Sequence, residues 1–404
     1  MKRGHADLPL HYGTVPPWLA QRMMQLGGAI VESIIMEYGR TALLQRMSDP
    51  FWFQSLGCVL GMDWHSSGIT TSVMNALKKA INKRSHDLGI YVCGGRGNAS
   101  RQTPDELLNI ADRTGLNGNE LVKASRLSAK VDNTAIQDGF QLYLHSFIVT
   151  KEGEWAVVQQ GMNQNERMAR RYHWMSAAVK SFTEEPHTSI YGKNQGLILN
   201  LTDKNAQPLK RGILDLTREN PDKLIKEISL IMPRQHEVQA KDVNLKRLGA
   251  TLALAHNIDI TDIESLLLLQ GVGPRTIQSL TLVSEVIHGT PSRFSDPARF
   301  SFAHGGKDGH PFPVPTSVYD ETIEIFDRSI HLAKLGDKEK SEALRNLSKV
   351  SLEIERGFTP NHNFDKVIQK ERDESYLYGG RTVSGEAKKP DKPKGGIQLN
   401  LFDW

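Results

Sequence analysis

Two glycines and a proline within the segment Gln270-Gly271-Val272-Gly273-Pro274-Arg275-Thr276 impose the tightest local constraint on how this chain folds. Glycines this close together end a helix, because glycine is a poor helix former. Pro274 suits the first turn of a second helix. The apolar residues of that second helix recur every three or four positions and are Ile277, Leu280, Val283 and Ile287. The sequence therefore predicts two helices joined by a sharp hairpin over residues 261–288.

The first of these helices is expected to begin at a capping box formed by Thr261 and Glu264. A Gly-Val-Gly turn beside a helix N-terminus exposes backbone N–H groups, a geometry that favours phosphate oxygens. Glycine at both positions allows a nucleic-acid backbone to approach closely. Such contacts give affinity without readout of base sequence. The residues expected to make them are Gly271, Val272, Gly273, Arg275 and Thr276.

This segment resembles the hairpin of the helix-hairpin-helix family, which occurs in DNA glycosylases, helicase subunits and nucleases. An ordinary helical corner capped by glycine is the alternative interpretation. The resemblance also brings in a glycosylase or lyase as an alternative function, since such enzymes carry a catalytic aspartate beyond the second helix. Asp296 is the nearest candidate here, although an Asp-Pro pair is also common in turns.

Changes of periodicity along the chain predict an α+β protein. Residues 1–220 combine helical patterns with a β-hairpin and are expected to form a mixed α+β domain that holds the catalytic site. Residues 225–360 are expected to form an all-α domain that contains the helix-hairpin-helix motif. Residues 380–404 have little apolar periodicity, so we expect a disordered C-terminal tail.

Within the mixed domain, helices are predicted over residues 19–44 and 69–81, and a short strand over residues 90–93. Residues 140–150 and 155–162 are rich in β-forming residues and are expected to form a hairpin. A third helix is expected to follow this hairpin. Its apolar face would carry Met168, Tyr172, Met175, Val179 and Phe182.

The register of the hairpin depends on the length of its loop. If Glu152-Gly153 is a two-residue loop, Lys151 pairs with Glu154. Counting outward from that pair places His145 opposite Gln160. We therefore expect these two side chains to face one another across the strands.

Polar residues in the first half of the chain suggest a catalytic site. Their types are those that bind divalent metals or transfer protons, so we expect phosphodiester cleavage assisted by Mg²⁺ or Mn²⁺. The metal-ligand set stays open, and the absence of a GxxxxGK[ST] pattern argues against a nucleotide cofactor. The candidate catalytic residues are Asp63, His65, Asp138, His145, Gln160 and His173. Asp63, Asp138 and His145 are expected to converge on one cleft.

Arginines are the second group of candidate DNA ligands. Arg96 and Arg101 lie in a Gly-rich loop that leads into a helix, where anion binding is plausible. Arg167, Arg170 and Arg171 are expected on the polar face of the third helix, beside His173 and Trp174. Arginine interleaved with aromatic residues suits phosphate contact and base stacking. A solvated helix face is the simpler alternative.

The end of the chain, Gln398-Leu399-Asn400-Leu401-Phe402, resembles the pentapeptide by which bacterial DNA polymerases and repair proteins bind the replication sliding clamp. Asn400 stands where that motif usually has Ser or Asp. The resemblance implies that Leu401 and Phe402 fill an apolar groove while Gln398 fixes the register, with Leu399 beside them. A chance match of five residues is the alternative.

Composition limits the remaining possibilities. Lys and Arg total 50 against 46 Asp and Glu, so the net charge of +4 does not by itself indicate a nucleic-acid binder. The two cysteines, Cys58 and Cys93, form no CxxC pattern and argue against a zinc site or a disulfide-built secreted domain. With no signal peptide and no apolar run of about 20 residues, we expect no membrane segment and a cytoplasmic, nucleoid-associated protein.

Several short sequence segments within residues 1–360 resemble those of an uncharacterised prokaryotic family, domain-of-unknown-function family 763. They include Asp63-Trp64-His65-Ser66-Ser67-Gly68, Gln159-Gln160-Gly161-Met162-Asn163 and Ala303-His304-Gly305-Gly306. The resemblance implies membership and no mechanism. Together these features predict a DNA-binding genome-maintenance protein, with a metal-dependent nuclease recruited by the sliding clamp as the leading hypothesis. A glycosylase or lyase and a non-catalytic clamp-associated adaptor are the alternatives.

Overall fold

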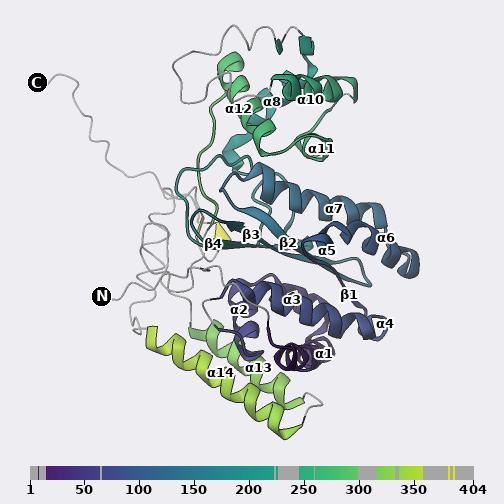
Figure 1. The fold of residues 1–404 in the computed structure, drawn as a ribbon, viewed down its shortest axis with the longest axis vertical. Coiled ribbons are helices and arrows are strands. Elements are labelled where there is room, and N and C mark those ends of the chain that lie inside the picture. The colour runs from purple at the N-terminus through teal and green to yellow at the C-terminus, as the bar shows by residue number, and fades with distance from the viewer. Residues whose placement is uncertain are drawn as a thin grey trace, which may run out of the picture.

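A five-stranded antiparallel sheet lies at the centre of the computed structural model, with helices on both of its faces (Figure 1). The structure describes residues 8, 15–63, 66–222, 224–225, 245–258, 260–298, 316–332, 336–357, 381–382 and 385–386. The strands follow one another in chain order across the sheet, each hydrogen-bonded to the next. They are β1 (Ile90–Arg96), β2 (Gln141–Thr150), β3 (Trp155–Asn163), β4 (Met168–Met175) and β5 (Ser189–Tyr191). Two further strands of two residues, Arg381–Thr382 and Gly385–Glu386, pair with each other.

The lower face of the sheet in Figure 1 is covered by the N-terminal helices. These are α1 (Pro17–Met47), α2 (Pro50–Val59), α3 (Gly68–Ile81) and the short α4 (Ser85–Leu88). Helices α13 (Thr316–Leu332) and α14 (Asp337–Gly357) pack against the outer side of α1 and α2 (Figure 1). Phe326 of α13 stacks on Trp52 of α2, with 5.0 Å between ring centroids. One apolar core therefore joins segments nearly 300 positions apart in sequence.

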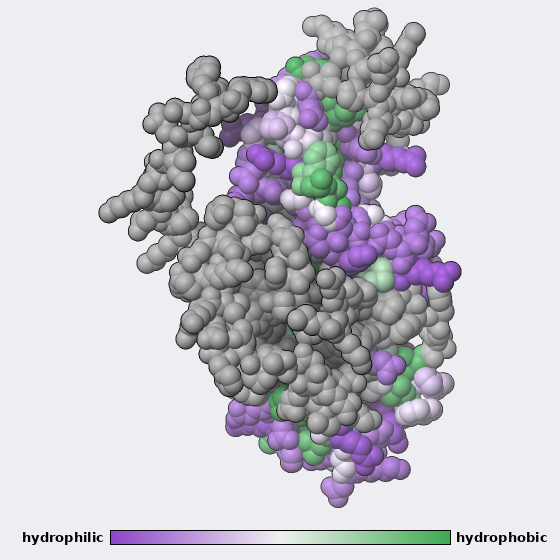
Figure 2. Space-filling view, turned by 90° about the vertical axis from the view of Figure 1, so that its left-hand side faces the viewer, coloured by the Kyte–Doolittle hydropathy of each residue, from purple (hydrophilic) through white to green (hydrophobic). Residues whose placement is uncertain are grey.

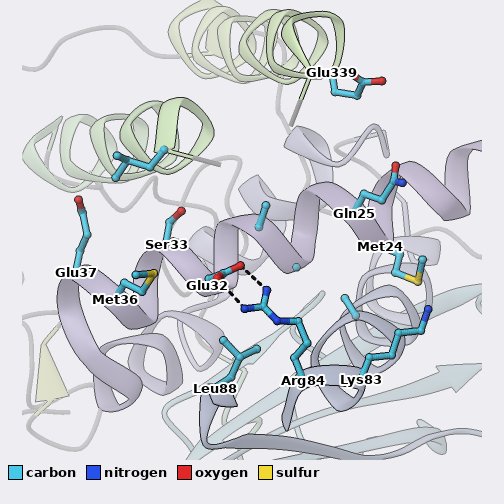
Figure 3. Close-up of a pocket in the computed structure, with 15 residues that line it drawn as sticks. Met24, Gln25, Glu32, Ser33, Met36, Glu37, Lys83, Arg84, Leu88 and Glu339 are labelled. Carbon is cyan, nitrogen blue, oxygen red and sulfur yellow. Dashed lines mark hydrogen bonds and ion pairs between the residues drawn. The ribbon is translucent and has the colours of Figure 1, made fainter. Parts of the chain in front are cut away.

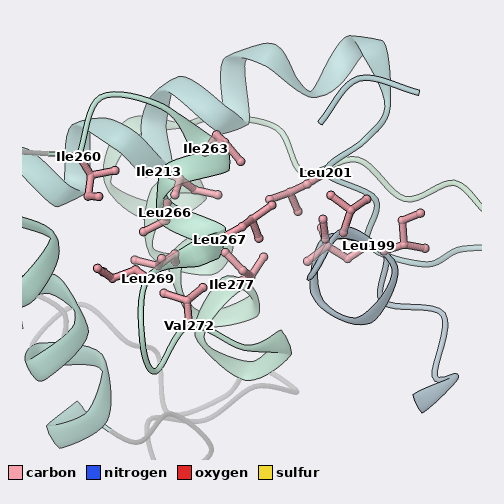
Figure 4. Close-up of a cluster of buried hydrophobic side chains, with 14 of the residues drawn as sticks. Leu199, Leu201, Ile213, Ile260, Ile263, Leu266, Leu267, Leu269, Val272 and Ile277 are labelled. Atoms are coloured by element: carbon pink, nitrogen blue, oxygen red, sulfur yellow. The ribbon is translucent and has the colours of Figure 1, made fainter. Parts of the chain in front are cut away.

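The upper face of the sheet carries α5 (Asn98–Arg101), α6 (Thr103–Thr114), α7 (Gly118–Lys130) and a π-helical turn, Val131–Ala135. Beyond them lie α8 (Gln207–Arg218), α10 (Leu245–Ile258), α11 (Ile263–Leu268) and α12 (Pro274–His288) (Figure 1). A single apolar core runs from the sheet into these last helices. Figure 4 shows Leu199 and Leu201 beside Leu267 and Ile277, where the two parts of this core meet.

Short sequence signals set several helix ends. Asp49 caps α2 by accepting a hydrogen bond from the Trp52 N–H, and Pro50 follows at the first helical position. Asn117 caps α7 in the same way, through the Glu120 N–H. Gly115 ends α6 with a φ of 77°, a left-handed conformation that glycine adopts without strain.

The α+β class, the helices predicted over residues 19–44 and 69–81, and the β-hairpin are confirmed. The helix predicted from Met168 to Phe182 is wrong, because residues 168–175 form strand β4. Their spacing suited a helix, but helices cover both faces of this sheet and bury residues on either side of the strand. Arg170 and Arg171, expected on the polar face of that helix, are fully buried.

The hairpin register also differs from the prediction. The Thr150 N–H donates to the Glu154 carbonyl and the Gly153 N–H to the Thr150 carbonyl, so the loop has three residues rather than two. Gly153 adopts a φ of 89°, as such loops require at their last position. This one-residue shift places His145 opposite Gln159, and Gln160 on the other face of the sheet beside Leu144.

Helices from both sides of the expected boundary near residue 220 pack against one another. Helix α8, assigned by prediction to residues 1–220, packs with α10 and α12 in the upper helical layer. Helices α13 and α14, assigned to residues 225–360, lie at the opposite end of the molecule against α1 and α2 (Figure 1). Residues 1–220 and 225–360 therefore contribute to both apolar cores.

Candidate functional site

Helices α11 and α12 follow one another with five residues between them, where two helices joined by a sharp turn were predicted. Helix α11 begins one residue later than expected. Its N-cap is Asp262, whose carboxylate accepts hydrogen bonds from the Ser265 N–H and hydroxyl, both at 2.8 Å. Glu264 does not complete a capping box with Thr261, because it accepts a hydrogen bond from the Phe182 N–H instead.

The two glycines of the turn serve different needs. Gly271 has a φ of 90°, a conformation that side-chain-bearing residues rarely adopt. Gly273 has an extended backbone with φ −146° and is the N-cap of α12. A Cβ atom built on Gly273 would meet no atom within 4 Å, so its open side faces outward. Between them Val272 is 3% exposed and anchors the turn in the core (Figure 4).

Two side chains from the segments that pack on the upper face of the sheet hold this turn in place. Lys130, at the end of α7, donates to the Val272 carbonyl at 2.6 Å. Gln137 donates through Nε2 to the Pro274 carbonyl at 2.9 Å. Burial lowers the pKa of Lys130. The turn is thus fixed relative to the sheet as well as to its own helices.

The outer side of the turn offers hydrogen-bond donors. Among the described residues, the N–H groups of Gly273, Arg275 and Thr276 have no acceptor, as is normal for the first turn of a helix. The Arg275 side chain is exposed beside them. Thr276 is buried and its hydroxyl donates to the Gly271 carbonyl, so only its backbone faces an incoming ligand. This geometry suits a phosphate oxygen.

The five other candidate arginines divide into two groups. Arg96, Arg101 and Arg167 are exposed in loops or at element ends, where they can contact a ligand. Arg170 and Arg171 are fully buried on opposite faces of β4 and cannot reach DNA. Their burial gives no support to the DNA-binding role predicted for these two residues.

Arg170 forms the centre of a buried ion cluster on the upper face of the sheet. Its guanidinium contacts the Asp138 carboxylate at 2.9 Å and the Asp296 carboxylate at 3.0 and 2.6 Å. Burial alone would lower the pKa of Arg170, but the two carboxylates raise it. Asp138 also accepts a hydrogen bond from the Tyr172 hydroxyl at 2.6 Å. This cluster ties the sheet to the segment that follows α12.

Asp296, the candidate for a glycosylase, is thus part of the protein core. Besides Arg170, the N–H groups of Gln195 and Ala298 donate to its carboxylate at 2.5 and 2.8 Å. Its side chain is 0% exposed. The carboxylate is closed to a substrate, which leaves the glycosylase hypothesis without its expected catalytic group.

On the lower face, Arg171 is surrounded by neutral acceptors. Its guanidinium donates to His173 Nε2 at 2.9 Å, to Gln54 Oε1 at 2.9 Å and to the Thr70 hydroxyl at 3.3 Å. Burial lowers the pKa of Arg171 to about 10 and that of His173 well below its usual range. Gln160 belongs to the same cluster, because its side chain bonds Thr70 and Tyr143. These residues pack α2 and α3 onto the sheet.

His145 lies in a separate polar chain on the upper face. Its Nε2 is 2.8 Å from the Ser125 hydroxyl and its Nδ1 is 2.9 Å from Gln159 Oε1. Burial lowers the pKa of His145 to about 4, so the imidazole is neutral at pH 7. A hydroxyl beside a neutral imidazole is the pair that nucleophilic catalysis uses. Ser125 is only 3% exposed, however, which closes this pair to substrate.

The series of polar contacts continues from Gln159, which donates a hydrogen bond of 2.6 Å to Asp132 in the π-helical turn. His187 Nε2 and Trp174 Nε1 contact the same carboxylate at 2.5 and 3.0 Å. Burial raises the pKa of Asp132, and His187 opposes that shift. The predicted catalytic set contains His145 but not its partners in this network, which are Ser125, Asp132, Gln159 and His187. A correct hairpin register would have identified Gln159 as the partner of His145.

The predicted catalytic residues do not assemble into one cleft. Asp63 is exposed in the loop after α2, on the lower side of the sheet. Asp138 and His145 lie on the upper face and are buried. His65 lies outside the described residues. Among the described residues, no group of three or more His, Cys, Asp or Glu side chains is placed to hold a metal ion.

One cavity of about 780 Å³ lies far from the hairpin, between α1, the turn into α4 and the ends of α13 and α14 (Figure 3). Figure 3 shows the Arg84 guanidinium directed at the Glu32 carboxylate, with contacts of 2.6 and 2.9 Å. Lys83, Glu37 and Glu339 also line the cavity. Charges of both signs are present, so electrostatics favour no particular ligand.

Comparison with known proteins places most of the chain in one family. The model of the family described as "Protein of unknown function (DUF763)" matches residues 4–314. The chain belongs to the DUF763 family. The match spans the sheet and the α11–α12 hairpin, so both are parts of the DUF763 region. No curated protein and no solved structure matches the chain.

Two further findings concern the expected partners. In the part of this DUF763 protein that the structure describes, no helix is long and apolar enough to cross a membrane. The clamp-binding residues Gln398, Leu399, Leu401 and Phe402 lie outside the described residues, as does the rest of the tail from residue 387.

Proposed function

We propose that this DUF763 protein binds duplex DNA through the α11–α12 hairpin and acts in genome maintenance. The observation that carries the proposal is the turn itself. N–H groups of Gly273, Arg275 and Thr276 are available at the start of α12, and Gly273 is open on its outer side. Such a site binds a phosphate oxygen of either DNA strand without distinguishing bases.

The surroundings of the turn support this role. Val272 in the core and the bonds from Lys130 and Gln137 fix the turn before any ligand arrives. A binding site ordered in advance loses less conformational entropy when the ligand binds. The exposed Arg275 adds a positive charge where the phosphate would lie.

Binding has more structural support here than cleavage. The residues predicted to cleave DNA lie on both faces of the sheet, and those on the upper face are buried. Metal-dependent nuclease activity stays a prediction. Incubation of the protein with labelled DNA and Mg²⁺ or Mn²⁺ would test it. If no shorter product strands appear, the result favours a DNA-binding adaptor.

Substitution of Gly273 by alanine separates binding from folding. Alanine tolerates the extended backbone of Gly273 and meets no neighbouring atom, so the fold is expected to persist. Its methyl group would occupy the approach to the N–H groups. We expect the affinity for unrelated duplexes to fall about tenfold for all of them, since charge-assisted hydrogen bonds to phosphate contribute about 1.5–3 kcal/mol.

The measurement is fluorescence anisotropy of labelled duplexes over a range of salt concentrations. Arg275→Gln should lower the slope of log affinity against log salt by about 1, while the same substitution at Arg113, exposed on α6, should leave that slope unchanged. A Gly273→Ala protein that binds as tightly as the wild type, or equal effects of the two arginine substitutions, would contradict the hairpin site.

We further propose that the C-terminal pentapeptide docks on the replication sliding clamp. Its sequence supports this, because Leu401 and Phe402 are large apolar anchors beside Gln398. The hairpin contacts phosphate alone and selects no location, so a clamp contact would supply the localisation that it lacks. Such tethering increases occupancy by raising the effective concentration of the hairpin at DNA.

A further inference from the structure

Two large apolar side chains are exposed near the α11–α12 hairpin. Leu197 is 83% exposed and Phe294 is 54% exposed. They belong to two segments that pair as a short antiparallel ribbon, with Leu199 opposite Phe294. The Ser295 N–H donates to the Ile198 carbonyl and the Asn200 N–H to the Arg293 carbonyl, which fixes the register.

Phe294 belongs to the bridge that joins the two segments, and Leu197 lies in the bend just before them. Leu199 turns into the core at 7% exposure, whereas Phe294 lies farther out.

The ribbon is close to the phosphate-binding turn. The Gln137 N–H donates to the Leu199 carbonyl at 2.9 Å, so residues 136–137 line the other edge of the 199–200 segment. The Gln137 side chain bonds the Pro274 carbonyl. Two strand spacings, about 10 Å, therefore separate Phe294 from the residue that holds the turn.

Charged side chains of both signs border the ribbon, because Glu166 and Glu285 accept hydrogen bonds from Gln195 and Ser292. Arg293, next to Phe294, is exposed and donates through Nε to the Asn205 carbonyl. Lys193 is exposed a few residues before Leu197. Asp203 is occupied by hydrogen bonds from the Ser295 hydroxyl and the Asn205 N–H. On the face shown in Figure 2, a small apolar patch in the upper half is bordered by hydrophilic surface.

The small area of the two apolar side chains distinguishes between a protein partner and a nucleobase as the ligand. Two side chains provide far less than the roughly 800 Å² that each partner buries in a stable protein interface. They do match one nucleobase, whose flat face stacks on an aromatic ring or inserts beside an apolar wedge. The solvent-exposed ring of Phe294, near the turn proposed to bind phosphate, provides a stacking surface for that base.

We propose that Phe294, with Leu197, stacks on a nucleobase that is unpaired or displaced from the helix, so that the DNA recognised by this protein is a distorted duplex. The inference rests on the proposed function, because the hairpin holds the backbone while the ribbon contacts the base. An intact duplex keeps its bases stacked on one another and offers only the phosphate contacts. A mismatch, bulge or gap lowers the cost of exposing a base.

The test compares two duplexes that differ by one bulged nucleotide, with 2-aminopurine as the bulged base. The wild-type protein should bind the bulged duplex about tenfold more tightly than the intact one, a difference of ~1.4 kcal/mol. Its binding should also quench the 2-aminopurine fluorescence. Phe294→Ala should abolish both the preference and the quenching while leaving the intact duplex affinity unchanged, and Phe294→Trp should retain them. Ile258→Ala, at a 56% exposed position on α10, is the matched control and should change neither.

The outcomes separate the two proposals. If the wild type binds both duplexes equally, or Phe294→Ala keeps the preference, the stacking role is overturned while the hairpin site stands. If Phe294→Ala weakens both duplexes alike, the residue acts on the fold and the stacking role is again overturned. If the full-length protein binds no DNA and Gly273→Ala therefore changes nothing, the proposed function itself fails.

Discussion

Asp296 gives the sharpest test of how the structure is held together. Its carboxylate accepts two hydrogen bonds from Arg170 and one each from the N–H groups of Gln195 and Ala298, all at 2.5–3.0 Å. The substitution Asp296→Asn keeps the shape but replaces one oxygen by an NH₂ group. Every partner of this carboxylate among the described residues is a donor, so that NH₂ group must face another donor.

The expected loss of stability follows from this geometry. Arg170 would keep Asp138 as its one carboxylate, and a buried charge interaction would be replaced by a donor–donor contact. Removing one partner of a buried ion pair costs about 3–5 kcal/mol. We expect the free energy of unfolding at pH 7 to fall by that amount. A large part of the 5–15 kcal/mol that typically stabilises a domain would be lost.

Urea unfolding monitored by tryptophan fluorescence measures this change. The matched control is Asp215→Asn, because Asp215 pairs with Arg218 at 3.4 Å while both side chains are 55% exposed. Pairs this exposed contribute little, so the control should lie close to the wild type. If the two substitutions destabilise equally, the buried cluster does not hold the ribbon to the sheet. If Asp296→Asn is fully stable yet removes a base-releasing activity, the glycosylase alternative gains support.

Two further results are expected. Burial lowers the pKa of His145 to about 4 from an ordinary 6.5, so between these pH values the unfolded chain binds more protons than the folded protein. The stability contributed by the neutral imidazole is therefore complete above pH 6.5 and is lost as the pH falls toward 4. His145→Gln should therefore reduce the stability loss between pH 7 and pH 5 by about 2 kcal/mol, and identical pH slopes in urea unfolding would refute the buried neutral imidazole. A peptide of residues 396–404 should bind the host's sliding clamp in calorimetry, and Leu401→Ala with Phe402→Ala should weaken binding more than tenfold. An inert wild-type peptide at high micromolar concentration would remove the proposed link to replication.

Local signals in the sequence predicted much of the fold. The spacing of Val73, Leu77 and Ile81 identified α3, and the glycines around Val272 identified the hairpin between α11 and α12. Such signals depend on neighbours in the chain and survive in a single sequence. Strand β4 was missed because its environment is set by distant segments. Arg170 has its partners at Asp138 and Asp296, and no local pattern reveals that a charged residue is buried.

The same difference between local and long-range signals applies to the candidate site. The backbone of the hairpin was predictable, since glycine and proline constrain backbone geometry directly. The proposed catalytic set was not, because it assumed that polar residues near one another in sequence meet in space. A three-residue turn ending at Gly153 moved Gln160 to the face opposite His145. One residue of register therefore decided which polar side chains could share a cluster.

The buried polar clusters explain how the exposed turn, which we propose binds DNA, is held rigidly. The hairpin has few residues of its own, and an isolated pair of helices this short would be unstable. Lys130 and Gln137 bind its carbonyls, and the Arg170–Asp296 contact anchors the ribbon that carries Phe294. Backbone donors and aromatic ring are therefore set at a fixed spacing by the sheet. A DNA duplex would meet both without further ordering of the protein, so its own deformability would decide which sites bind.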